Sequence, residues 1–208
     1  MIEVISSSFI TEESEDIVEN LAGVLIGKYS PGNDSDDFKG IVALTLYRQL
    51  PILMKLIKGD FKGKKILDIG CGSIDSKYER GTAYGPWLCR ALLELGAMPI
   101  GVDKNTNRSE RFQNYQADLE EKRTGLLSFL PSGSVDIVNS AGLFTHEGIN
   151  LKNMEDFLVP EIKRVGKTQG FFVHDEPYLA TGLSRLSYRL QPKPYALSGR
   201  PLHFLNSP

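Results

Sequence analysis

From residue 64 onward, short apolar runs alternate with helical segments, and this alternation limits the chain to few folds. Strands that alternate with helices form parallel sheets through crossover connections, and helices then cover both faces of the sheet. We therefore expect an α/β fold with a doubly wound, mainly parallel sheet. The expected strands are 66–69, 99–102, 113–117, 135–139 and 170–174. The expected helices are 86–95, which Pro86 would begin, 152–165 and about 178–190.

The two ends of the chain predict further elements around this core. Residues 11–28 carry apolar side chains on one helical face and acidic residues in the first turn, as in an amphipathic helix that docks on a larger surface. A polar loop at 29–38 leads to a second helical stretch, 39–59, which Pro51 is expected to kink or divide. After residue 190 the chain is long enough for a short terminal hairpin.

The length of 208 residues and the hydrophobic content of 41% suit one domain with a full core. Within a single domain over 1–208 we expect an N-terminal helical cap region at 1–60 and a ligand-binding core at 61–208. The sequence leaves the oligomeric state open.

Charge and hydropathy favour a soluble, cytoplasmic protein that binds neither nucleic acid nor membrane. The chain has 24 basic and 26 acidic side chains, so it lacks the large positive field that holds a phosphate backbone. It has no signal-peptide pattern and no unbroken run of about eighteen apolar residues. Cys71 and Cys89 are not closely spaced in the sequence and match neither a zinc ribbon nor a disulfide scaffold, so we expect reduced thiols.

The stretch "ILDIGCGSID", residues 66–75, places an acidic residue and two glycines at the carboxyl end of the first expected strand. Ligands bind at such strand ends in doubly wound sheets, and glycine lets them approach the backbone closely. The turn is also expected to offer main-chain amides to an anion. An ordinary strand-to-loop turn is the alternative.

A dinucleotide-binding fold is the competing functional interpretation of the same stretch. Gly70, Gly72 and Asp75 match the G-x-G-x-x-G pattern at all but its last position. Asp75 replaces the glycine that lets helix and strand pack closely, and Asp68 would repel an anionic pyrophosphate. A ligand with an ammonium group suits Asp68 better.

The motifs "ILDIGCGS", "PIGVDKN", "YQADLEE", "VDIVNSAGLFTH" and "GFFVHDE" follow one another in this order on the expected strand ends. Together they resemble the ordered motifs of class I S-adenosylmethionine-dependent methyltransferases over roughly residues 60–176. The resemblance implies that S-adenosylmethionine is the cofactor. It also implies that Gly70, Cys71 and Gly72 receive its methionine part and that Asp68 helps to hold its amino group.

The later motifs supply the remaining cofactor residues that the resemblance implies. Asp103, with Lys104 beside it, ends the second strand, and its carboxylate can accept hydrogen bonds from both ribose hydroxyls, as in NAD-binding proteins. Asp118 matches the position that reaches the adenine amino group, with Leu119 next to it, although Asp118 could equally be a helix N-cap. Ser140 lies where the family completes the cofactor site.

The same resemblance points to a small-molecule acceptor. The stretch "NSAGLFTH" lacks the Asn-Pro-Pro-aromatic motif of methyltransferases that act on amino groups of nucleic acids or on protein amides. Metal-dependent members need acidic ligands at the ends of the fourth and fifth strands, but the fourth ends here in Asn139 and Ser140. We therefore expect no catalytic metal.

A general base is needed only for a weak nucleophile, because the sulfonium methyl group is already activated. His146, after the fourth strand, has a side chain suited to proton transfer near neutral pH, although it could simply order its loop. Glu176, after the fifth strand, is the second candidate, although the following Pro177 is also consistent with simple strand termination.

An insertion at 74–86 lengthens the connection between the glycine turn and the next helix relative to the family pattern. With the N-terminal region it is expected to reach over the carboxyl ends of the strands and form the acceptor pocket, although it could equally be a surface loop. The expected acceptor-binding residues are Tyr29, Tyr78, Glu79 and Tyr84.

These observations favour an enzyme that transfers a methyl group from S-adenosylmethionine to an oxygen or nitrogen atom of a small molecule. A catalytically inactive S-adenosylmethionine-binding regulator would keep the same cofactor residues without a usable acceptor pocket. An NAD(P)-dependent oxidoreductase is less consistent with Asp68 and Asp75.

Overall fold

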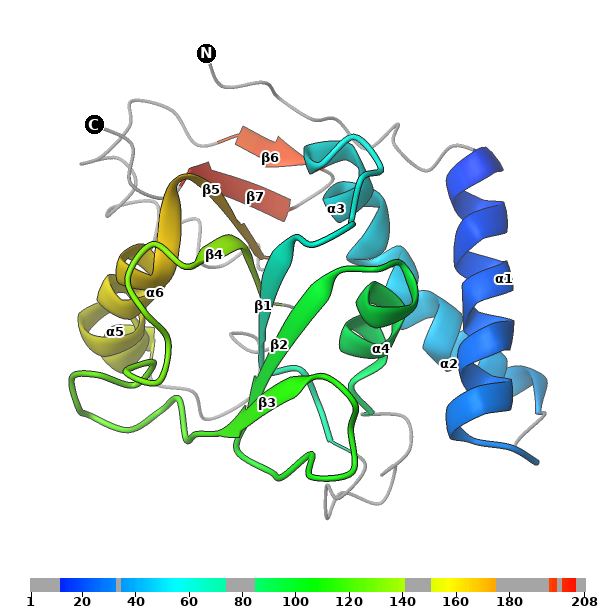
Figure 1. Ribbon diagram of the computed structural model, residues 1–208, viewed down its shortest axis with the longest axis horizontal. Coiled ribbons are helices and arrows are strands. Elements are labelled where there is room, and N and C mark those ends of the chain that lie inside the picture. The colour runs from blue at the N-terminus through cyan, green and yellow to red at the C-terminus, as the bar shows by residue number, and fades with distance from the viewer. Residues whose placement is uncertain are drawn as a thin grey trace.

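The chain folds around one twisted sheet, seen nearly edge-on in Figure 1. The computed structural model describes residues 12–32, 35–73, 85–140, 151–174, 195–197 and 200–204. These residues form a seven-stranded sheet with the strand order β3-β2-β1-β4-β5-β7-β6. The strands are β1 (Lys65–Ile69), β2 (Met98–Asp103), β3 (Gln113–Gln116), β4 (Val135–Ser140), β5 (Gly166–His174), β6 (Tyr195–Leu197) and β7 (Arg200–Phe204).

Strand direction separates the sheet into two parts. Strands β3, β2, β1, β4 and β5 are parallel to their neighbours, whereas β7 runs antiparallel to both β5 and β6. The expected parallel sheet and terminal hairpin are therefore confirmed. The chain leaves β1 towards β2 and β3 on one side and continues with β4 and β5 on the other. The strand order thus reverses between β1 and β4, and ligands bind at the carboxyl ends of such a switch point.

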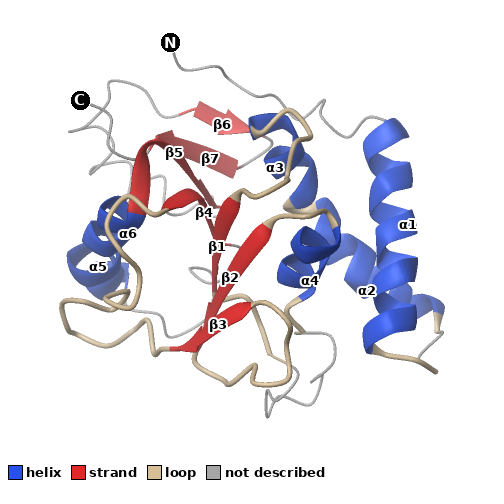
Figure 2. Cartoon of the chain, viewed as in Figure 1, coloured by secondary structure: helices blue, strands red, loops and turns tan. Residues whose placement is uncertain are grey.

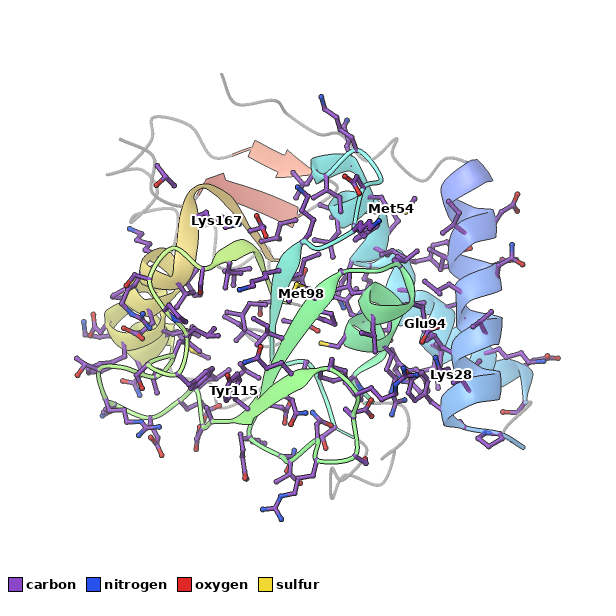
Figure 3. The ribbon with its side chains drawn as sticks, in the orientation of Figure 1. Lys28, Met54, Glu94, Met98, Tyr115 and Lys167 are labelled. Carbon is purple, nitrogen blue, oxygen red and sulfur yellow. The ribbon has the colours of Figure 1, made fainter. Side chains whose placement is uncertain are left out.

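One face of the sheet is covered by the N-terminal helices and α4, as Figure 2 shows. These helices are α1 (Glu12–Tyr29), α2 (Asp36–Tyr47), α3 (Leu50–Leu56) and α4 (Trp87–Glu94). Their apolar side chains form one core cluster that includes Ile66 of β1 and Ile137 of β4. An ion pair between Lys28 and Glu94 also joins α1 to α4 (Figure 3).

The opposite face carries the second core cluster. Here α5 (Leu151–Asn153), the π-helical turn Met154–Leu158 and α6 (Val159–Val165) follow one another. Buried side chains of the π-helical turn and of α6 share this cluster with residues of β1, β2 and β4. The expected helix at 152–165 therefore exists, but one turn of it is π-helical. Helices cover both faces, as predicted, so the strand ends are the accessible edge of the core.

Proline explains where the second N-terminal helix is divided. The expected stretch 39–59 forms α2 and α3, which are separated at Arg48 and Gln49. Pro51 lies in the first turn of α3, where its missing N–H group costs no helical hydrogen bond. Pro86 precedes α4 rather than beginning it, one residue away from the expected start.

Strand β5 begins at Gly166, four residues before the expected start. Its first residues include Lys167, which is labelled in Figure 3. Lys167 forms an ion pair with Asp136 at 2.7 Å. Because its first residues are polar, a search for apolar runs does not detect the start of this strand. The helix expected at about 178–190 lies outside the described residues. None of the described helices is both long and apolar enough to cross a bilayer.

Candidate functional site

The glycine turn after β1 is folded against the end of β2. Gly70 and Gly72 have φ angles of 73° and 84°, a backbone conformation that favours glycine. The amides of Gly70 and Cys71 both donate to the carbonyl oxygen of Val102, at 2.8 and 3.2 Å. The tight turn thus exists because two glycines permit it and because the neighbouring strand holds it.

Asp103, at the end of β2, holds the third amide of this turn. Its Oδ2 accepts from the Gly72 amide at 3.0 Å, and its Oδ1 accepts from the Asn105 amide at 2.9 Å. The amides of Gly70, Cys71 and Gly72 are therefore all engaged within the protein. The prediction that the turn offers main-chain amides to an anion is wrong for these three amides, because Val102 and Asp103 accept from them instead.

The same contacts define what Asp103 can still bind. A carboxylate has about four lone-pair sites. The two amides and Asn105 Nδ2, the latter at 3.2 Å, occupy three of them. The backbone donors fix the carboxylate beside the turn, whereas the Asn105 side chain can rotate away. Two ribose hydroxyls would have to displace that side chain.

Sequence reasoning missed Asn107 as part of this arrangement. Its Nδ2 donates to the carbonyl oxygen of Gly72 at 2.8 Å, and its buried Oδ1 has no partner. Ser73 Oγ donates to the carbonyl oxygen of Thr106 at 2.7 Å. The loop after β2 therefore holds the turn at Gly72 and at Ser73. In the sequence "DKNTN" this loop is not distinguishable from an ordinary polar loop.

Asp68 of β1 lies in the core directly below the turn, with 3% of its surface exposed. Its Oδ1 accepts from Nδ2 of Asn139 at 2.8 Å, and Cys89 Sγ donates to its Oδ2 at 3.7 Å. Asn139 lies opposite Asp68 in the register of β1 and β4. Its Nδ2 also donates to Oε1 of Gln49 at 2.6 Å, which joins the N-terminal helices to this site.

The two cysteines, distant in the sequence, meet beside Asp68 and form a small cluster with Phe112. Both thiols are free. Hydrogen bonding with Cys89 lowers the pKa of Cys71, but burial and the charges of Asp68 and Asp103 outweigh this effect, so the net pKa is raised. Burial raises the pKa of Cys89 strongly, and its bond to Cys71 adds to this. Both side chains therefore behave as neutral packing groups.

Gly101 of β2 makes this packing possible. A Cβ atom there would lie 2.8 Å from both Cys71 Sγ and Phe112 Cε2. Only glycine fits without displacing the cysteine of the turn. The sequence shows a glycine within a strand but not what approaches it.

The remaining expected cofactor residues take different environments. Lys104 is exposed at the end of β2. Asp118 is exposed, and its Oδ1 accepts from the Glu120 amide at 3.0 Å, so it caps a turn rather than a helix. The Leu119 side chain is buried in the second core cluster. Ser140, the last residue of β4, has a buried Oγ without a partner.

Tyr29 packs beside a buried ion pair that the sequence did not reveal. Arg90 of α4 donates to both carboxylate oxygens of Glu110. Its guanidinium lies 4.4 Å from the ring centre of Tyr29 and 4.5 Å from that of Trp87. Tyr29, the last residue of α1, thus packs against Arg90 of α4.

Several expected residues lie outside the described part of the chain. They are His146, Glu176, Tyr78, Glu79 and Tyr84. Their roles in catalysis and acceptor binding stay predictions. Among the described residues, no group of three or more potential metal ligands comes together.

No family model matches this chain, and no curated protein matches it in sequence. Solved structures do match. A 16S rRNA methyltransferase from T. thermophilus, in complex with AdoMet and guanosine, aligns with a TM-score of 0.52 and 18% identity over 86% of this chain and 45% of its own. MycE, a methyltransferase of the mycinamycin biosynthetic pathway in complex with Mg and SAH, aligns with a TM-score of 0.52 and 15% identity over 94% of this chain and 62% of its own.

This chain has the fold of the class I S-adenosylmethionine-dependent methyltransferases. The expected fold class is therefore confirmed. The chain spans about half to two thirds of the length of these two structures. At such low identity the methyltransferase fold is what the similarity shows, so the activity has to be argued from the site.

Proposed function

We propose that this protein transfers a methyl group from S-adenosylmethionine to an oxygen or nitrogen atom of a small molecule. The observation that carries the proposal is the edge of the sheet at the switch point. There, a glycine turn lies between two carboxylates, Asp68 and Asp103, on neighbouring strands. A class I methyltransferase fold with acidic residues at these strand ends suits a ligand that carries both an ammonium group and a ribose.

The residues present fit such a cofactor. The turn of Gly70, Cys71 and Gly72 would lie against its methionine part, because two residues without side chains leave the backbone open to close approach. Asp68 would hold the amino group and Asp103 the ribose. Buried acceptor atoms without partners, Oδ1 of Asn139 and Oγ of Ser140, lie at the same strand end. The other proposed contacts are Lys104, Asp118 and, through its backbone, Leu119.

The cofactor would supply a methyl group that is already activated on a sulfonium sulfur. The protein then has to bind the acceptor, align its nucleophile and exclude water, and such alignment can supply much of the rate enhancement. His146 or Glu176 would accept a proton where the nucleophile is a hydroxyl group. Tyr29, Tyr78, Glu79 and Tyr84 would line the acceptor pocket.

The small-molecule acceptor is supported by charge and by one of the similar structures. A net charge of −2 provides no strong attraction for a phosphate backbone. MycE belongs to a biosynthetic pathway for mycinamycin, whereas the T. thermophilus protein is an rRNA methyltransferase. Because the net charge is slightly negative, we propose a small-molecule acceptor rather than RNA. We further propose a cytoplasmic location and a single domain, in which residues 1–60 form a cap region on the 61–208 core.

Calorimetric titration tests the cofactor, and methyl transfer tests the acceptor. S-adenosylhomocysteine is expected to bind and NAD to give no heat of binding. Transfer from labelled S-adenosylmethionine is then measured with pools of small alcohols, phenols and amines, and in parallel with total RNA. Absence of S-adenosylhomocysteine binding would refute the cofactor assignment. Labelled RNA without any labelled small molecule would refute the acceptor class.

A further inference from the structure

Gln49 is a buried polar residue at the junction of α2 and α3, with 7% of its surface exposed. Its carbonyl oxygen accepts the first helical hydrogen bond of α3, from the Leu53 amide at 3.2 Å. Its side chain does not cap that helix. Instead, Oε1 accepts from Asn139 at the carboxyl end of β4, 90 residues further along the chain.

This contact fixes which way the Asn139 amide points. Nδ2 of Asn139 has two hydrogens, one donated to Gln49 Oε1 at 2.6 Å and one to Asp68 Oδ1 at 2.8 Å. Rotating the amide by half a turn would place Oδ1 against two acceptor oxygens, which is repulsive. Gln49 and Asp68 therefore hold Asn139 in one orientation.

The fixed orientation leaves Asn139 Oδ1 buried and without a partner next to the Asp68 carboxylate. Burying an acceptor without a hydrogen bond is unfavourable, so a hydrogen bond from a ligand's donor to this atom would stabilise the complex. An acceptor amide oxygen next to a carboxylate suits an ammonium group, which has three hydrogens to donate and no acceptor.

We propose that Gln49 is a positioning residue for recognition of the cofactor's α-amino group. It orients Asn139, so that Asn139 Oδ1 and the Asp68 carboxylate together accept the hydrogens of that group. This inference rests on the proposed binding of S-adenosylmethionine. It gives the N-terminal helices a role in cofactor selection, in addition to any role in acceptor binding.

Two ligands separate this role from a general effect on the fold. S-adenosylhomocysteine carries the amino group, whereas methylthioadenosine has the same adenosine and sulfur but lacks the amino-acid part. We expect Gln49→Met, which removes the acceptor oxygen at similar volume, to weaken S-adenosylhomocysteine about fivefold, as for one hydrogen bond near a charge. Its affinity for methylthioadenosine, measured by the same calorimetric titration, should stay unchanged.

Two further variants serve as controls. Ile52→Val removes one methylene from the same buried helical region and leaves the hydrogen bonds intact, so both affinities should match those of the wild type. Gln49→Glu keeps an acceptor oxygen at the same reach and should restore the ratio of the two affinities towards the wild-type value. Thermal unfolding of each variant establishes that it is folded.

The outcomes distinguish this inference from the proposed function. If the wild type binds neither ligand, the cofactor assignment fails and the inference fails with it. If the wild type binds both but folded Gln49→Met weakens both equally, or neither, Gln49 has no role in amino-group recognition and the cofactor assignment stands. A selective loss that Ile52→Val reproduces would also overturn the inference.

Discussion

The two sides of the switch point are built in different ways. On the β2 side, the glycine turn is held by Asp103 and Asn107, which lie 31 and 35 residues from Gly72 in the sequence. On the β4 side, Asp68 is held by Asn139, 71 residues away, and Asn139 by Gln49, 90 residues away. The β2 side is a compact unit of one strand-helix-strand segment. The β4 side joins two paired strands and adds a contact from the N-terminal helices through Gln49.

The difference suggests that the two sides respond separately to mutation. Changes on the β2 side would loosen the turn and the proposed ribose site directly. Changes in the N-terminal helices would act through Asn139 on the amino-group side. Four predictions test this division. The first concerns a contact between the N-terminal helices and the β2 side.

The largest effect is expected at the Arg90–Glu110 pair, which connects Tyr29 of α1 with the loop after β2. Both side chains are buried, and Arg90→Met would leave the Glu110 carboxylate without its partner. Urea denaturation should show a loss of about 3–5 kcal/mol in the free energy of unfolding. The double variant Arg90→Met with Glu110→Leu should recover most of that loss, because two apolar groups leave no buried charge. A single variant as stable as the wild type would contradict this account.

A smaller loss is expected for Gly101→Ala. The added Cβ would lie 2.8 Å from Cys71 Sγ, so the turn has to shift. We expect a destabilisation of about 1–3 kcal/mol in urea and a weaker titration with S-adenosylhomocysteine. The matched control is Gly40→Ala, because nothing lies within 4 Å of a Cβ at Gly40 in α2. That variant should be as stable as the wild type or slightly more stable. Equal stability of the two variants would argue against the close packing of the turn.

Asp103→Ala should weaken S-adenosylhomocysteine about tenfold, because it removes the proposed ribose acceptor and frees the Gly72 amide. Unlike Gln49→Met, it should weaken methylthioadenosine to the same extent, since both ligands carry the ribose. Asn105→Ala is the comparison, because it removes only the side-chain donor that occupies Asp103 Oδ1. We expect that variant to bind both ligands at least as tightly as the wild type. If Asp103→Ala weakens the binding of S-adenosylhomocysteine but not that of methylthioadenosine, Asp103 contacts the amino-acid part of the cofactor and not its ribose.

The smallest effect concerns the thiols. Folding raises the pKa of Cys71 and Cys89 above their ordinary value of 9.0. Below that value both states hold the thiol protons. Above it the unfolded chain loses them first, so stability falls as pH rises. Urea denaturation between about pH 8 and about pH 10 should show a smaller decline for Cys89→Ala than for the wild type. Identical declines would mean that the Cys89 thiol does not contribute to the loss of stability at high pH.

The sequence by itself determined the parallel sheet, both covering layers and the glycine turn. Apolar runs, helical periodicity and glycine are local properties, and each acts within a few residues of its own position. Pro51 marked the division between α2 and α3 for the same reason. The polar start of β5 was missed, because its residues pair with β4 without forming an apolar run. Asp68 and Asp103 were recognised as strand-end carboxylates from their motifs.

Only the tertiary structure decided what these carboxylates contact. Asp68 contacts Cys89 of α4 and Asn139 of β4. Asn139 in turn contacts Gln49, at the junction of two N-terminal helices. Gln49, Asn107 and Arg90 carry no signal in the sequence, because a polar side chain in a helix or loop is most often solvated. Their roles arise from burial, which removes water as a partner and makes each remaining hydrogen bond depend on groups brought together by the fold.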